Sequence, residues 1–195
     1  AFTFRYYDAI KDDSQKVYSK IFAYSSVMVS FFFGLIIGAL VSGKIQSSST
    51  GFVDSYIYPW LNLFSFSTGI FTSTIFAFTA AVYLIGETQD NEAKKIMIKK
   101  SKRSALIMVM SGGLVFAASL IDQVHFAESF MDNTFANILI LLATVLLPGL
   151  WYSLDKAYSW LSRILVGAEL FLILGAFYVV YFPSIIILDN GRSYD

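Results

Sequence analysis

The sequence predicts an all-α protein, a polytopic membrane helical bundle with about five transmembrane helices in a single domain over residues 1–195. Three observations predict this fold class. Hydrophobic residues make up 56% of the chain and charged residues only 14%, whereas soluble domains carry about 25% charged residues. Five apolar segments have the length of roughly 20 residues that a bilayer-crossing helix needs. The basic residues also alternate between the two sides that these segments define.

The five predicted spans are joined by short connections. They cover residues 21–43, 60–85, 104–121, 135–152 and 164–182. Pro59 precedes the second span, where a missing N–H does no harm, and Gly86 is expected to end that span. Thr88 or Asn91 is expected to cap the helix that follows. Residues 87–103 form a basic loop, interpreted as a helical extension that projects from the membrane and continues into the third span.

The distribution of basic residues predicts the orientation of the chain. Lys and Arg accumulate in the cytoplasmic loops of membrane proteins. Of the 14 Lys and Arg residues, four precede the first span, six lie in loop 87–103 and two lie between the fourth and fifth spans. Only Lys44 and Arg192 fall on the other side. The pattern predicts a cytoplasmic N-terminus and a C-terminus outside.

Gly34 and Gly38 form a G-x-x-x-G pair in the first span. Small residues at this spacing let two helices approach closely in lipid. Two interpretations follow from the sequence: a tight contact with a partner protein, or packing against another helix of the same bundle.

Glu169 is the one carboxylate well inside a predicted span. It lies a few residues past the basic end of the fifth span, at a depth of roughly 7–8 Å from Arg163–Ile164 at 1.5 Å per residue. A carboxyl in the membrane is costly and is a functional hypothesis by default. Glu169 is therefore a candidate for a proton path, or for a hydrogen bond to a neighbouring subunit. The alternative is a structural carboxyl that reaches the headgroups or pairs with Arg163.

The remaining residues offer little chemistry of their own. The chain has no cysteine and a formal net charge of zero, which excludes thiolate catalysis and gives no basic field for nucleic acid. His125, the only histidine, lies outside the spans with Asp122 and Glu128 nearby. Their spacing makes a metal site conceivable, but a solvated loop is favoured because metal sites prefer more nitrogen or sulfur donors. We expect no catalytic, metal or cofactor site on this chain, so that a partner would hold any cofactor.

Three stretches resemble the cytochrome bd quinol oxidase subunit II family. The first span ends in the family's pattern "G-x-x-x-G-x-L-x-x-G", at Gly34, Gly38, Leu40 and Gly43. The second span, "LNLFSFSTGIFTSTIFAFTAAVYLIGET", is similar to the family's "L-N-P-F-x-L-x-x-G" segment and its exit "Y-L-x-x-x-T". The matching residues are Leu61, Asn62, Phe64, Gly69, Tyr83, Leu84 and Thr88, with Leu63 in place of the usual proline. Phe182–Pro183 resembles the family's exit from its penultimate helix.

The resemblance implies a function that the residues alone do not give. It implies a haem-free subunit that packs against a haem-bearing subunit I in a bacterial cytoplasmic membrane. That complex would oxidise quinol, reduce dioxygen to water and take up protons. The family usually has about eight spans and a "G-F-D" motif in its first helix, and both features are missing here, so the chain is expected to be an internal fragment.

Two other classes of protein remain open at this point. One is a fragment of a small transporter or permease, although such proteins favour broken helices and polar sites at the membrane midplane. The other is a membrane assembly factor without a site. Co-purification with a haem-bearing partner would distinguish the oxidase subunit from both alternatives.

Overall fold

The structure, a computed structural model, describes residues 14–45, 51–53, 57–88, 90–183, 186–187 and 193–194. Five long helices dominate it: α2 (Ser14–Val41), α4 (Leu63–Glu87), α5 (Asn91–Ile121), α7 (Thr134–Asp155) and α8 (Ser159–Tyr181). A short helix, α6 (Phe126–Asp132), joins α5 to α7, and two-residue strands β1 (Ile186–Ile187) and β2 (Ser193–Tyr194) pair antiparallel. By length and composition, all five long helices can cross a membrane. The predicted all-α fold with five spans is confirmed.

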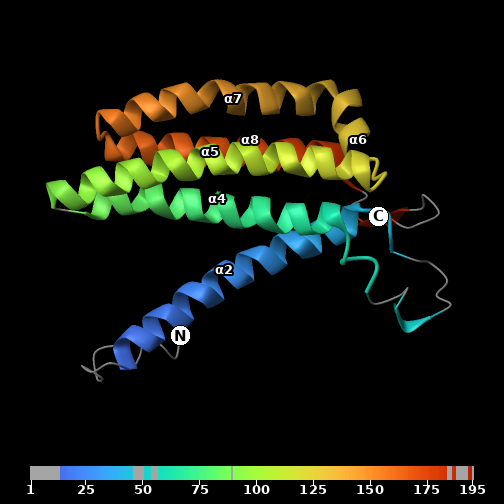
Figure 1. Cartoon of the computed structure of the whole chain (residues 1–195). Helices are drawn as coiled ribbons and strands as arrows, with labels where there is room; N and C mark the ends of the chain where they lie inside the picture. The colour runs from blue at the N-terminus through green and yellow to red at the C-terminus, as the bar shows by residue number, and fades with distance from the viewer. Residues whose placement is uncertain are drawn as a thin grey trace.

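Four of the helices form a bundle and the fifth diverges from it (Figure 1). Helices α4, α5, α7 and α8 run side by side, with close pairing of α4 with α5 and of α7 with α8. Helix α2 packs chiefly on α4, near the C-terminal end of α2, and its N-terminal half points away from the bundle. We call the end of the bundle where α4 ends and α5 begins the basic end, because loop residues 87–103 lie there.

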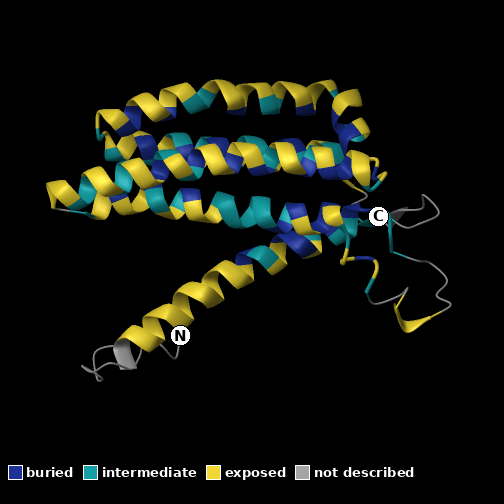
Figure 2. Ribbon diagram, in the orientation of Figure 1, coloured by how far each residue is buried: buried dark blue, intermediate teal, exposed yellow. Residues whose placement is uncertain are grey.

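The burial pattern follows this arrangement (Figure 2). The N-terminal half of α2 is exposed, with Tyr24 73% accessible, whereas Leu35 and Val41 in its C-terminal half are buried. Two hydrophobic clusters fill the bundle, one around Phe78 and Leu150 toward the basic end and one around Phe126 toward the opposite end.

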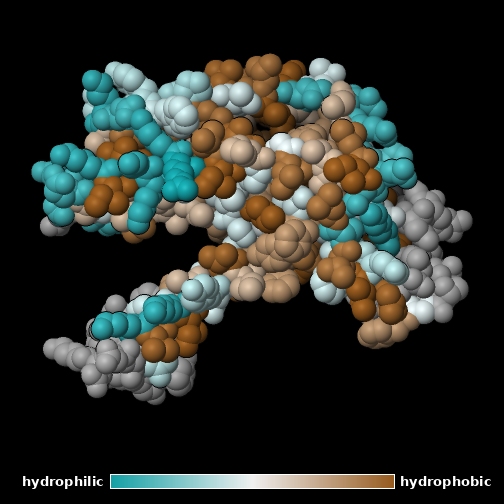
Figure 3. Space-filling view, in the orientation of Figure 1, coloured by the Kyte–Doolittle hydropathy of each residue, from teal (hydrophilic) through white to brown (hydrophobic). Residues whose placement is uncertain are grey.

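Large apolar side chains also cover the outside of the bundle (Figure 3). In a soluble protein such a surface would promote aggregation. Lipid is as apolar as these side chains, so the same surface is compatible with a membrane.

Helix boundaries differ from the prediction at several points. Helix α4 does not end at Gly86 but runs through it to Glu87, with Thr88 as C-cap. The physical reason for the glycine is a close approach, since a Cβ at Gly86 would lie 2.3 Å from the Arg163 guanidinium. The N-cap of α5 is Asp90, neither Thr88 nor Asn91, because its carboxylate accepts hydrogen bonds from two backbone N–H groups.

Other boundaries agree with the prediction or refine it. Helix α5 is continuous over its 31 residues, so the basic extension and the third span are one helix, as expected. Helix α8 begins at Ser159, five residues before the predicted span. The sequence interpretation treated the outer connection after the third span as a loop, and it missed the seven-residue helix α6 there.

Candidate functional site

Glu169 is the eleventh of the 23 residues of α8, about 15 Å from the first residue of that helix at 1.5 Å per residue. Because α8 begins earlier than predicted, Glu169 lies at the centre of the helix and not near its end. Its side chain is only 3% accessible, and it is the only charged residue in the buried class within the described part of the chain. It does not reach toward the headgroups, which excludes one of the two structural alternatives for this carboxyl.

The second structural alternative, an ion pair with Arg163, is also wrong. Arg163 donates from Nη2 to the Glu87 carboxylate at 2.6 Å and to the Tyr83 carbonyl at 3.1 Å. Its guanidinium also lies over the Tyr83 ring, 5.4 Å from the ring centroid. Arg163 thus ties α8 to the end of α4, and Oε2 of Glu169 accepts no hydrogen bond from any described residue.

The face of α8 that carries Glu169 points into the bundle. Ser162, Val166 and Ala176 are buried on the same face, since they follow the spacing of three, four and seven residues that aligns side chains on a helix. Val166 belongs to the cluster toward the basic end and Ala176 to the cluster toward the opposite end. Glu169 therefore lies between the two apolar clusters, and no described residue forms an ion pair with it.

Two pairs of hydroxyl groups join neighbouring helices of the bundle. The Ser153 and Ser162 Oγ atoms lie 2.8 Å apart between α7 and α8, and Ser162 precedes Glu169 by two turns on the same face, about 10 Å along the helix. Thr74 Oγ1 and Ser111 Oγ lie 2.8 Å apart between α4 and α5. Among the described residues, no hydrogen bond joins either pair to Glu169.

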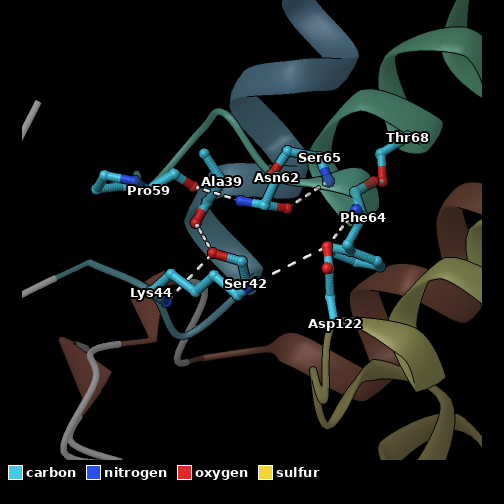
Figure 4. A network of polar contacts seen from close by, with 9 residues as sticks. All are labelled: Ala39, Ser42, Lys44, Pro59, Asn62, Phe64, Ser65, Thr68 and Asp122. Atoms are coloured by element: carbon cyan, nitrogen blue, oxygen red, sulfur yellow. Dashed lines mark hydrogen bonds and ion pairs between the residues drawn. The ribbon is translucent and has the colours of Figure 1, made fainter. Parts of the chain in front are cut away.

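A second polar network lies at the end opposite the basic end (Figure 4). The Asp122 carboxylate accepts a hydrogen bond from the Phe64 N–H at 2.7 Å and lies 3.7 Å from the Lys44 ammonium. Asn62 caps α4 by accepting a hydrogen bond from the Ser65 N–H at 2.8 Å. Asp122 thus joins α2, α4 and α5, beside an open cleft of about 650 Å³. The sequence interpretation missed this role, although the Asp that follows α5 and the isolated Lys44 were visible signals.

The trio of Asp122, His125 and Glu128 does not form a metal site. Asp122 turns toward α4, while His125 and Glu128 are exposed and 3.9 Å apart. Among the described residues, no group of three or more His, Asp or Glu side chains is placed to hold a metal ion.

Gly34 and Gly38 lie against α4 of the same chain. A Cβ at Gly34 would lie 2.7 Å from the Thr68 carbonyl oxygen, and a Cβ at Gly38 would lie 2.7 Å from the Ser65 Cα. The contact is reciprocal, because a Cβ at Gly69 of α4 would lie 2.8 Å from the Phe31 ring of α2. Of the two interpretations of the glycine pair, the geometry is that of packing against another helix of the same chain.

These features are those of a multi-pass helical membrane protein in which buried polar groups join the helices to one another. The chain belongs to the cytochrome bd terminal oxidase subunit II family, whose model matches residues 1–190. A comparison with curated proteins gave no match. Family membership places the chain in a complex with another oxidase subunit and in a membrane, and it favours the oxidase interpretation over a transporter or an assembly factor.

Proposed function

We propose that this chain is the haem-free subunit II of a quinol:oxygen oxidoreductase and that it packs against a haem-bearing subunit I in a bacterial cytoplasmic membrane. The observation that carries the proposal is the family match over residues 1–190 on a chain with five spans. The partner would hold the haems and the quinol site. The position of His125 supports this division, because histidine is a common axial ligand of haem iron and this side chain is exposed, in the turn before α6.

We further propose that Glu169 belongs to a route that delivers protons for oxygen reduction. Reduction of dioxygen to water consumes protons, and with the predicted orientation the basic end faces the cytoplasm that supplies them. A carboxyl can take up and release a proton, and Glu169 lies buried in the middle of its span, where its Oε2 has no hydrogen-bond partner among the described residues. The buried hydroxyl pair of Ser153 and Ser162 lies between Glu169 and the basic end, in the position that an entry segment of such a route would need.

The test compares two substitutions that each remove one titratable carboxyl. Glu169→Gln keeps the shape and the hydrogen-bonding groups but cannot carry a proton, so turnover of the purified oxidase should fall by about tenfold or more. Glu128→Gln makes the same chemical change at an exposed position on α6 and should leave turnover unchanged. Glu169→Asp retains a titratable group and should recover part of the activity.

Haem absorbance and the ratio of subunits are measured on the same preparations. They should match the wild type in all three variants, which separates a loss of proton delivery from a loss of assembly. Full turnover of Glu169→Gln from about pH 6 to about pH 8 would exclude Glu169 from the route and leave it as a structural carboxyl. Absence of a haem-bearing partner from the wild-type preparation would instead overturn the subunit assignment.

A further inference from the structure

One face of α5 carries a row of cations that the fold does not use. Lys99 and Arg103 are exposed and four residues apart, which places them on the same side of the helix. Ser101, Ala105 and Met108 are buried and occupy the opposite side, against the bundle. We call Lys99 and Arg103 the basic stripe. Its orientation away from the other helices follows from the helical period alone.

The charges of the basic stripe are unpaired, unlike those of other basic residues on the same helix. Lys95 forms an ion pair with Glu92 at 3.2 Å, and Lys102 forms one with Asp155 of α7. Within the described residues, neither Lys99 nor Arg103 has an ion pair or a side-chain hydrogen bond. On this face the helix therefore presents two cations that no carboxylate of the described residues neutralises.

The basic stripe continues directly into an apolar surface. Leu106, Met110 and Leu114 follow it on the same face of α5 and are 52%, 68% and 46% accessible. Side chains on a helix tilt toward its N-terminus, so Lys99 and Arg103 extend away from this apolar surface and toward the basic end. The cations thus lie where the apolar part of the helix meets water, at the level of lipid headgroups.

We propose that this face of α5 is a binding site for an anionic phospholipid. The phosphate would contact Lys99 and Arg103, and the acyl chains would lie along Leu106 and Met110. Charge complementarity supports this ligand, because an arginine fork and an ammonium suit phosphate oxygens. The exposed apolar residues beside the cations also favour a lipid as the ligand. Acyl chains can cover these residues directly, whereas a protein partner would gain little by replacing lipid there, because lipid is as apolar as the side chains.

The experiment measures binding of short-chain phosphatidylglycerol to the purified, delipidated oxidase complex by native mass spectrometry. Neutral phosphatidylcholine is the reference lipid. The site variant is Lys99→Gln with Arg103→Gln. The control variant is Lys94→Gln with Lys156→Gln, which removes the same charge at the same end of the bundle from residues outside the stripe, since Lys94 is five residues from Lys99 and lies on another side of α5.

The site variant should bind phosphatidylglycerol about 25-fold more weakly, at about fivefold for each basic residue near the lipid. Phosphatidylcholine binding and the subunit ratio should not change, and the control variant should lose less than about threefold, since exposed charges at a distance are screened. Equal losses of phosphatidylglycerol affinity in the two variants would show that the basic residues attract the lipid by their overall charge, without a specific site, and would overturn the proposal. Loss of the partner subunit from the site variant, with lipid affinity unchanged, would identify the face as a protein contact and also overturn it.

Discussion

Replacing glycine by alanine should lower the stability of the protein at Gly34, which packs against α4, and raise it at Gly113, which faces open space. In Gly34→Ala the new Cβ would lie 2.3 Å from Thr72 Oγ1 and 2.7 Å from the Thr68 carbonyl oxygen. The Thr72 hydroxyl can rotate, but Thr72 Cβ, at 2.6 Å, and the Thr68 carbonyl are fixed to the α4 backbone. Moving the carbonyl oxygen from 2.7 Å to an ordinary contact of 3.4 Å requires the two helices to separate by about 0.7 Å.

The expected magnitude is the difference between two terms. Overpacking costs about 1–3 kcal/mol, and a contact with an immovable carbonyl places Gly34→Ala at the upper end of that range. Replacing a helical glycine by alanine stabilises the helix by about 1 kcal/mol. The net loss is therefore about 2 kcal/mol, which lowers the unfolding midpoint by roughly 4–8 °C for a chain of this size.

Gly113→Ala is the matched control. Gly113 lies on α5, also inside a helix, and a Cβ there would meet nothing within 4 Å. Only the helix-propensity term acts, so the midpoint should rise by roughly 2–4 °C. The assay is thermal unfolding of the purified complex, followed by subunit-specific detection of this chain.

A second measurement locates the change at the α2–α4 contact. Ser30 Oγ and Ser73 Oγ lie 3.4 Å apart across it, and the chain has no native cysteine. A Ser30→Cys and Ser73→Cys pair should therefore crosslink readily, more slowly when combined with Gly34→Ala and at an unchanged rate with Gly113→Ala. If Gly34→Ala raised the midpoint as Gly113→Ala does and left crosslinking unchanged, the close packing of α2 on α4 would be refuted.

Two further predictions concern the two ends of the bundle. A cysteine at the exposed position Lys100 should react with an impermeant reagent only from the cytoplasmic side, and one at Glu128 only from outside; the reverse pattern would invert the predicted orientation. Asp122→Ala should destabilise the chain by about 1–2 kcal/mol in thermal or denaturant unfolding, because it leaves the Phe64 N–H without its acceptor and Lys44 without its partner. Asp122→Asn keeps an acceptor and should lose less, so equal losses in the two variants would argue against a capping role.

The sequence by itself determined how many spans the chain has and where they lie. Length and apolar content are sufficient for this, because a bilayer requires roughly 20 apolar residues for each crossing regardless of what packs beside them. The continuity of α5 was visible for the same kind of reason, since no strong breaker separates the basic extension from the third span. The glycine spacing of α2 also indicated a close helix contact in advance.

Only the tertiary structure decided which faces of these helices meet one another. A spanning helix is apolar toward lipid and toward its neighbours, so the periodicity that marks the buried face of a soluble helix carries little information here. The sequence left open whether Glu169 pairs with Arg163, and the structure decides against this pair because Arg163 binds Glu87 on a distant segment. Gly86 looked like a helix end, but it makes room for that same arginine. Both outcomes depend on contacts between residues about 80 positions apart, which local sequence patterns do not encode.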